Sequence, residues 1–221
     1  MRNNLAKKDE IMLELAPKLK ITVRLTVKEV DGTISYDKEA PAHSFNRNFW
    51  NFMFGTVGCS TGGNVNNFGS GYMSGKSTAG TVYYSNAGYA YGGGGMVGAL
   101  SNSSYGIVVG TSAAAFTVEQ FALGAQCVQG TGTNNLQHAA QAFPTISWTV
   151  GTRTWLAVHT RIFNNNSAGA IGINETGLYW SVYMYGGGLF MLERNVLGGT
   201  VTVGIGAQLT VTYNISVVFP W

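Results

Sequence analysis

Few side chains in the later part of this sequence could carry out acid–base chemistry. Beyond residue 47 the only carboxylates are Glu119, Glu175 and Glu193, and no Asp follows Asp37. A glycoside hydrolase needs two carboxyl groups across a cleft, and Glu175 and Glu193 are the pair that adjacent strands could bring together. The alternative is a structural role, in which Glu193 lies beside Arg194 and Glu175 accepts backbone N–H bonds. We expect the structural role.

The three histidines do not form a metal-binding or nucleophilic motif. His43, His138 and His159 are far apart, without HxH or HExxH spacing, and no Gly-x-Ser-x-Gly turn is present. His159 lies in an alternating segment, which indicates a surface or interface position. We therefore expect no catalytic residues, no metal site and no enzymatic activity.

One glycine-rich segment is close to a phosphate-binding loop but lacks an essential residue. In GSGYMSGKS, residues 69–77, Ser70 stands where the pattern G-x-x-x-x-G-K-[ST] requires its first glycine. The flanking sequence is rich in Gly and Ser, without the buried strand and the helix that such a loop connects. The later sequence also offers no Asp for Mg²⁺. We expect no nucleotide and no other cofactor.

Charge is concentrated at the beginning of the chain. Sixteen of the 23 charged side chains lie in residues 1–47, and the overall charged fraction of 10% compares with about 25% in typical domains. Two interpretations stay open: a neutral surface of Ser, Thr, Asn and Gly, or a surface covered by neighbouring subunits. Interface cores are poor in charge and rich in aromatics, and 11 Phe, 11 Tyr and 5 Trp favour the second interpretation.

Several classes of partner are disfavoured by composition. The formal net charge is only +3 and no long Lys/Arg run occurs, so dedicated nucleic-acid binding is not expected. No run of 18 apolar residues predicts a membrane span, and the polar start MRNNLAKKDE is unlike a signal peptide. Cys59 and Cys127 are isolated. They could pair, but in an intracellular assembly we expect two buried thiols.

The first elements to position these residues are a short helix and a hairpin. Residues 4–16 place four apolar side chains near one helical face before Pro17, namely Leu5, Ile11, Met12 and Leu15. Such a short helix needs a partner, so we interpret residues 1–18 as an arm that contacts its own body or a neighbouring subunit. The alternating segment 20–30 predicts a half-buried strand, and Asp31-Gly32 predicts the turn to the next.

A second helix is expected over residues 44–54, SFNRNFWNFMF, with Ser44 as its cap. The expected apolar side comprises Phe45, Phe49, Trp50, Phe52, Met53 and Phe54. The expected polar side comprises Asn46, Arg47, Asn48 and Asn51. The width of the apolar side predicts a buried helix that closes one end of a sandwich.

Residues 55–105 are rich in Gly, Ser, Asn and Tyr, and we interpret them as long loops around one or two short strands, with TVYY as a candidate. Glycine and tyrosine together suit loops that pack closely while offering aromatic contact area. The expected interface residues here are Tyr72, Tyr83, Tyr84, Tyr89 and Tyr91. The alternative is a flexible insertion without a partner.

From residue 104 the pattern is that of short strands separated by Gly and Asn turns. Candidates are SYGIVVG, TISWTV, TRTWLAVHTRIFN, AIGINETGLYWSVYMY, LFMLERNV, TVTVG and QLTVTYNISVVF, and TVEQFAL has capping-box spacing for a single helical turn. Without long helices between them, these strands predict an all-β, antiparallel, jelly-roll-like sandwich. We expect one domain over residues 19–221 that carries the 55–105 insertion.

The order of several weak motifs resembles a family of structural proteins from tailed bacteriophages and archaeal tailed viruses. The motifs are IVVGTS, VEQFAL, RIFNNNSAGAIGINETGLYW and the closing FMLERNVLGGTVTVGIGAQLTVTYNISVVF, with a looser match at SFNRNFWNFMF. Together they cover about two-thirds of the chain. One departure is Arg194-Asn195, where the family pattern has Arg-Asp. The resemblance carries over no catalytic residue.

The resemblance implies a virion subunit of the neck, tail, fibre base or capsid surface, located in the particle and assembled in the host cytoplasm. Its expected partners are copies of itself and other virion proteins. The alternative is a receptor- or carbohydrate-binding module of a tail fibre, with a host glycan as ligand. In both cases Glu175, Glu193 and Arg194 are expected to be structural.

Overall fold

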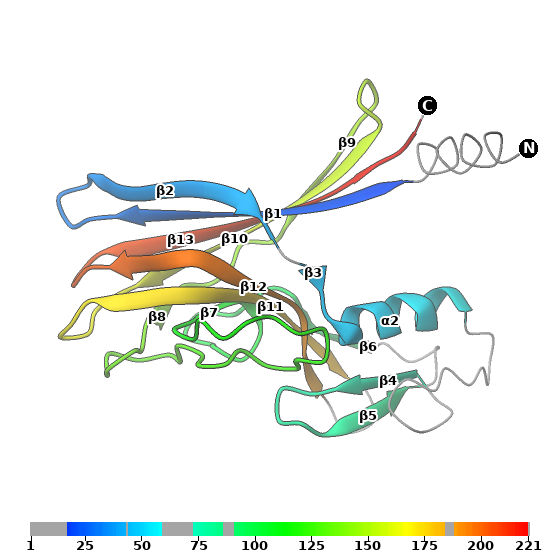
Figure 1. The fold of residues 1–221 in the computed structure, drawn as a ribbon, viewed down its shortest axis with the longest axis horizontal. Helices are drawn as coiled ribbons and strands as arrows, with labels where there is room; N and C mark the ends of the chain where they lie inside the picture. Colours follow the sequence, from blue (N-terminus) through cyan, green and yellow to red (C-terminus); the bar gives the residue numbers. More distant parts are fainter. Residues whose placement is uncertain (1–16, 43, 59–72, 86–90, 184–187, 221) are drawn as a thin grey trace, which may run out of the picture.

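The computed structural model describes residues 17–42, 44–58, 73–85, 91–183 and 188–220 (Figure 1). The expected N-terminal helix, with Leu5, Ile11, Met12 and Leu15, lies outside these residues. Tyr72, Tyr89, His43 and Cys59 also lie outside them. No helix in the described ranges combines the length and apolar character needed to cross a membrane.

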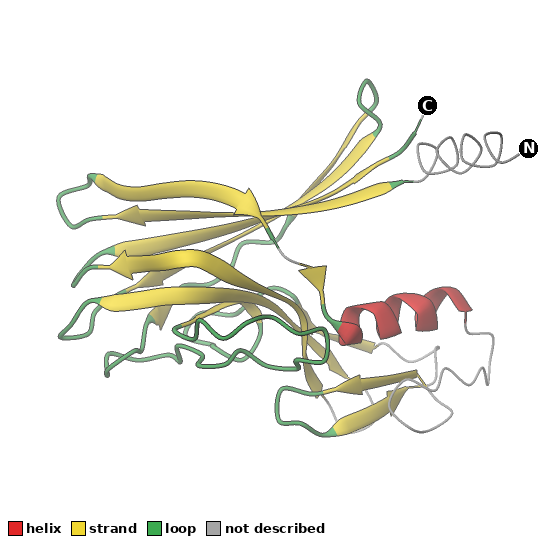
Figure 2. Ribbon diagram, viewed as in Figure 1, coloured by secondary structure: helices red, strands yellow, loops and turns green. Residues whose placement is uncertain are grey.

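Two antiparallel sheets face each other, which confirms the expected all-β sandwich (Figures 1 and 2). The first sheet has the order β2 (Ile34–Pro41), β1 (Lys18–Lys28), β13 (Gln208–Val218), β10 (Thr154–Asn164) and β8 (Gln137–His138), and β9 (Thr145–Thr149) also pairs with β10. The second has the order β3 (Ser44–Phe45), β12 (Gly188–Val203), β11 (Ile171–Tyr183) and β6 (Tyr91–Gly95), and β7 (Gly106–Gly110) also pairs with β11.

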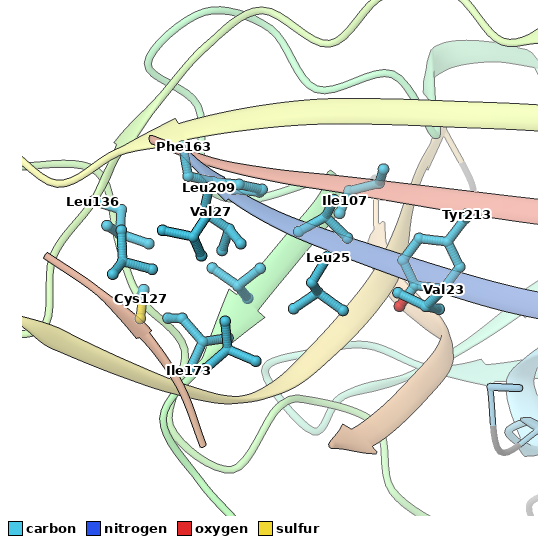
Figure 3. Packing of buried hydrophobic residues seen from close by; sticks show 14 of the residues in the cluster. Val23, Leu25, Val27, Ile107, Cys127, Leu136, Phe163, Ile173, Leu209 and Tyr213 are labelled. Atoms are coloured by element: carbon cyan, nitrogen blue, oxygen red, sulfur yellow. The ribbon is translucent and has the colours of Figure 1, made fainter. Parts of the chain in front are cut away.

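The hydrophobic core fills the space between the sheets (Figure 3). In β1 alternate residues point inward, so Val23, Leu25 and Val27 are buried. On the opposite face of β1, Arg24 donates to Asp37 of β2, with Nε 2.7 Å from Oδ1. The alternation expected from the sequence therefore separates an apolar inner face from a charged outer face.

The only helix among the described residues is α2 (Arg47–Gly58), which begins three residues later than expected. Ser44 and Phe45 pair with β12 instead of starting the helix. Asn46 is the cap, because its Oδ1 accepts a hydrogen bond from Phe49 N at 3.3 Å. The expected cap at Ser44 was therefore wrong.

The faces of α2 also differ from the expectation. The asparagine side, expected to be the polar face, is buried at Asn46, Asn48 and Asn51, whereas Trp50 and Met53 on the expected apolar face are 40% and 47% exposed. The reason is hydrogen bonding: Asn46 and Asn48 both donate to the carbonyl of Met191 in β12. Buried amides here satisfy backbone groups that apolar side chains would leave unpaired.

Part of the Gly-rich region is more regular than expected. The TVYY segment forms β5 (Val82–Ser85), and it pairs with β4 (Met73–Lys76), a strand that the sequence did not indicate. In β4, a Cβ on Gly75 would lie 2.5 Å from Phe52 Cζ, so only glycine fits beneath α2. Lys76 lies over the Phe121 ring at 4.1 Å, in a hairpin and not in a phosphate-binding loop.

Three further expectations differ in detail. LFMLERNV and TVTVG form one continuous strand, β12. The segment TVEQFAL forms a β-turn instead of a helical turn, in which Gln120 N donates to Thr117 O and Thr117 N donates to Gln120 Oε1. The short strands β6 and β8 were not expected, since glycine or a single residue pair gives no alternation.

Candidate protein-interaction site

Most of the charge beyond residue 47 is inside the protein. Of the seven charged side chains in this part of the sequence, four are at most 1% exposed: Arg161, Glu175, Glu193 and Arg194. The other three, Lys76, Glu119 and Arg153, are exposed or half-buried. The surface beyond residue 47 is therefore even less charged than the composition indicated.

Glu175 and Arg194 form an ion pair in the interior, across the β11–β12 hairpin. Arg194 Nε lies 2.6 Å from Glu175 Oε2, and both side chains are fully buried. Glu175 also accepts the backbone N–H bonds expected of it, from Gly124 at 3.1 Å and Ala125 at 2.9 Å. A Cβ on Gly110 would lie 2.5 Å from Glu175 Oε1, so glycine is needed where the carboxylate approaches β7.

The rest of the Arg194 guanidinium binds the loop between β7 and β8. Its Nη1 donates to Gln120 Oε1 at 2.9 Å and its Nη2 to Ala114 O at 2.9 Å. Buried ion pairs are stable only when their remaining donors and acceptors are satisfied, as they are here. Glu175 and Arg194 thus hold a long loop against the second sheet.

Glu193 belongs to a separate chain of hydrogen bonds. It does not pair with Arg194, which was the expected arrangement. The Tyr213 hydroxyl donates to Glu193 Oε2 at 2.6 Å, and Thr176 Oγ1 lies 2.7 Å from the same hydroxyl. Glu193 Oε1 has no hydrogen-bond partner among the described residues. Burial raises the pKa of Glu193 to about 8, so its carboxyl is largely protonated at neutral pH.

Arg161 was not singled out by its sequence, although it is almost fully buried. Its guanidinium donates to five backbone carbonyls, those of Ala99, Asn102, Tyr105, Ile107 and Ala139. All five N–H donors of the side chain are therefore used. Burial lowers the pKa of Arg161 to about 10. The residue fastens β10 to the segment that leads into β7.

The described histidines are also interior. His159 is 4% exposed, so the expected surface position was wrong: it shares the inward side of β10 with Arg161 and Phe163. His138 Nε2 lies 3.1 Å from Cys127 O, and burial lowers the pKa of His138 to about 4. Cys127 is a buried free thiol. Within the described ranges, no three His, Cys, Asp or Glu side chains gather as metal ligands would.

The buried polar groups are not accessible to a large substrate. Glu175 and Glu193 are both 0% exposed, so a polysaccharide cannot contact either carboxyl group in this structure. A glycosidase requires both groups at the substrate. The buried groups instead connect strands and loops. A site that contacts other molecules therefore lies on the surface.

An apolar surface continues the core beyond the second sheet. The strands β1, β13, β10 and β9 pair in register, so their facing residues form two rows on the inner face. The outer row is Leu19, Val217, Trp155 and Trp148, and the inner row is Ile21, Ile215, Ala157 and Ile146. We call these eight residues the open face.

Most of the open face is uncovered because the two sheets diverge, whereas Ile21 at its inner edge is buried. Figure 2 shows the ends of β1 and β13, with the β9–β10 hairpin, bending away from the strands of the second sheet. The next row inward, which includes Val23 and Tyr213, is fully covered. By contrast, Leu19, Trp148, Trp155 and Ile146 are 42%, 41%, 47% and 65% exposed.

The aromatic side chains at this end are held in a fixed arrangement. The rings of Trp148 and Trp155 lie 5.3 Å apart, and Phe219 lies 6.0 Å from Trp148 in an edge-on orientation. Arg153 Nη1 donates to Pro220 O at 2.7 Å, and Phe219 N donates to Arg153 O. The end of the chain is thus bound to the β9–β10 turn, and the aromatic surface is preorganised.

The expected tyrosine site is only partly within the described residues. The Tyr83 ring packs edge-on against Phe190 at 5.9 Å and is half-buried, so it contributes to internal packing. Tyr84 and Tyr91 lie on β5 and β6. The open face was missed, although TISWTV and the start of β1 carry its residues, because only the strand register brings them together.

The fold and this surface define an all-β sandwich with an exposed apolar face. No family model, no curated protein and no solved structure matches the chain.

Proposed function

We propose that this chain is a structural subunit of a tailed-virus particle, which acts through contacts with other protein subunits and not through catalysis. The proposal joins the motif order at SFNRNFWNFMF, VEQFAL and the C-terminal strands with the properties of the described surface.

The open face is the observation that carries the proposal. Its eight residues are apolar, and their only hydrogen-bonding side-chain groups are the two indole N–H groups. An apolar surface that is contiguous and preorganised is characteristic of protein–protein contact. Leaving it in water costs free energy, which a partner recovers by covering it.

The distribution of charge supports the same function. Net surface charge keeps free proteins apart, and beyond residue 47 only Lys76, Glu119 and Arg153 retain an exposed or half-exposed charge. One of them, Glu119, is itself paired, because it accepts from Arg47 Nη1 at 2.9 Å. Such a surface favours association over the monomeric state in dilute solution.

The alternative, a glycan-binding module, has less support from the described surface. Sugar recognition combines an aromatic platform with polar side chains that bind hydroxyl groups. The open face supplies aromatic rings at Trp148 and Trp155, but the other six side chains of the two rows are aliphatic. Protein contact fits this composition better.

The decisive experiment is quantitative mass spectrometry of purified tailed-virus particles whose genome encodes the chain. We expect its peptides at a fixed ratio to the major capsid protein. Complete particles without any peptide of this chain would contradict the proposal. A glycan array probed with wild type and with Trp148→Ala tests the alternative, which requires glycan binding that the substitution removes.

A further inference from the structure

We infer that the open face binds the open face of a second copy of this chain, which gives a two-fold symmetric dimer. This inference rests on the proposed function and names the partner of the same surface. It is argued from the chemistry of the two residue rows, from their area and from the position of the nearby charges.

The chemistry of the open face is self-complementary. In a two-fold contact every side chain meets a side chain from the same patch, so a charged patch would oppose like charges. Neither row contains a charged residue, and this penalty is absent. A partner with an ionic or strongly polar surface would instead lose hydration without gaining ion pairs or hydrogen bonds.

The nearby charged side chains do not point into the proposed contact. Lys18, Lys20 and Thr22 alternate with Leu19 and Ile21, so they lie on the other face of β1. In the β9–β10 turn, the guanidinium of Arg153 donates to Pro220 O. Two copies can therefore approach through the rows while these cations stay in solvent.

The area is sufficient for a specific contact. Trp148 and Trp155 of the open face and the adjacent Phe219 are 41%, 47% and 38% exposed, and large aromatic side chains offer about 150–250 Å² each. With Leu19 and Ile146 they present roughly 500 Å² per copy, or roughly 1,000 Å² in a pair, which reaches the lower limit for specific interfaces. Two such sheet faces pack about 10 Å apart with interdigitating side chains.

Two matched substitutions test the inference on the full chain. Ile146→Asp places a carboxylate on the open face, where Ile146 is 65% exposed. Ile205→Asp makes the same change at a residue that is 60% exposed in the β12–β13 turn, next to the far end of β13. Both sites are exposed, so both variants should fold, which circular dichroism can verify.

The readouts are the molar mass from sedimentation velocity and the oxidation of Trp148 and Trp155 by hydroxyl-radical footprinting. We expect wild type and Ile205→Asp to be dimers with protected indoles. Ile146→Asp should dissociate more than about 100-fold more readily, because it buries an unpaired carboxylate twice, and its indoles should become reactive.

Several outcomes would overturn the inference. A dimer that Ile146→Asp leaves intact uses another surface, and a trimer excludes the two-fold contact. A wild-type monomer with protected indoles indicates that residues 1–16 or another part of the same chain covers the rows, whereas a monomer with reactive indoles leaves them bare. Each of these results leaves the proposed function standing, since that function is decided by the content of the particle.

Discussion

At the scale of single residues, the molecule is organised around buried polar groups that hold strands and loops together. Arg161 directs all five N–H donors at backbone carbonyls, and each guanidinium nitrogen of Arg194 donates to a loop carbonyl or to a side-chain oxygen. Such residues fix irregular segments that lack regular strand pairing, such as the segment between β7 and β8. Charge that a surface would normally carry is used here as internal hydrogen bonding.

Glu193 makes stability depend on pH in a defined direction. Its pKa of about 8 in the folded protein lies above the ordinary 4.5, so the folded state keeps a proton that the unfolded state loses. The contribution of Glu193 to the free energy of unfolding is therefore full below pH 4.5, decreases up to about pH 8 and is lost above it. His138, with a pKa lowered from 6.5 to about 4, acts in the opposite direction but only below pH 6.5.

We predict that the urea midpoint of wild type decreases between pH 6.5 and pH 8 and that Glu193→Gln removes most of this decrease. Glutamine keeps an acceptor for the Tyr213 hydroxyl but cannot ionise. Glu119→Gln is the control, because Glu119 is 58% exposed, and this variant should keep the wild-type dependence. An equal slope in Glu193→Gln and wild type would show that another group titrates.

The sequence predicted part of this polar cluster. It identified Glu175, Glu193 and Arg194 as structural because too few carboxylates remained for chemistry. The pairing was wrong, since Arg194 binds Glu175 across the hairpin whereas neighbours along a strand, such as Glu193 and Arg194, point to opposite faces. Arg161 was missed because its burial depends on which face of β10 meets the core.

At the scale of elements, strands with strong alternation were predictable and those made of glycine were not. β1, β10 and β13 follow from their alternating apolar residues, whereas β6 is YGGGG and gains its place only from β11 beside it. The start of α2 was misplaced because Ser44 is a good cap in isolation. Pairing of Ser44 with Arg194 competes with that role and moves the cap to Asn46.

One amide side chain of α2 binds both backbone groups of Lys76 in the β4–β5 hairpin. Asn48 Oδ1 accepts from Lys76 N at 2.8 Å, and its Nδ2 donates to Lys76 O at 2.8 Å. We predict that Asn48→Ala increases the exchange rate of the Lys76 amide by about 10- to 100-fold, because both backbone groups lose their partner. Hydrogen exchange with mass spectrometry or NMR measures this rate.

Met53→Ala is the matched control for the hairpin prediction. Met53 lies on the same helix and is 47% exposed, so its truncation should leave the exchange of Lys76 nearly unchanged. Equal protection of Lys76 in wild type and Asn48→Ala would mean that β5 alone maintains the hairpin.

At the scale of the whole molecule, the two sheets pack against each other at one end and diverge at the other (Figure 2). The inner face of the first sheet therefore forms half of the core at one end and the open face at the other. The sequence could not reveal this, since Leu19 and Trp155 alternate in the same way as the buried residues further along their strands. Only the divergence of the two sheets in the folded protein separates the covered rows from the open rows.

Association through the open face should be insensitive to salt. The residue rows contain no charge, so ions have no interfacial pair to screen. We predict that the dimer dissociation constant changes less than about threefold between 0.05 M and 0.5 M NaCl, measured by sedimentation equilibrium. A steep loss of affinity with added NaCl would indicate that the dimer is held by ionic contacts elsewhere.

The charged outer side of the β1–β2 hairpin has one more consequence. Arg24, Asp37 and Glu39 lie there, while the described surface beyond residue 47 carries few charges. The surface charge of the molecule is therefore distributed unevenly. On an ion-exchange resin or a charged grid it should adsorb by this edge, always in the same orientation, and present its uncharged flanks to the liquid.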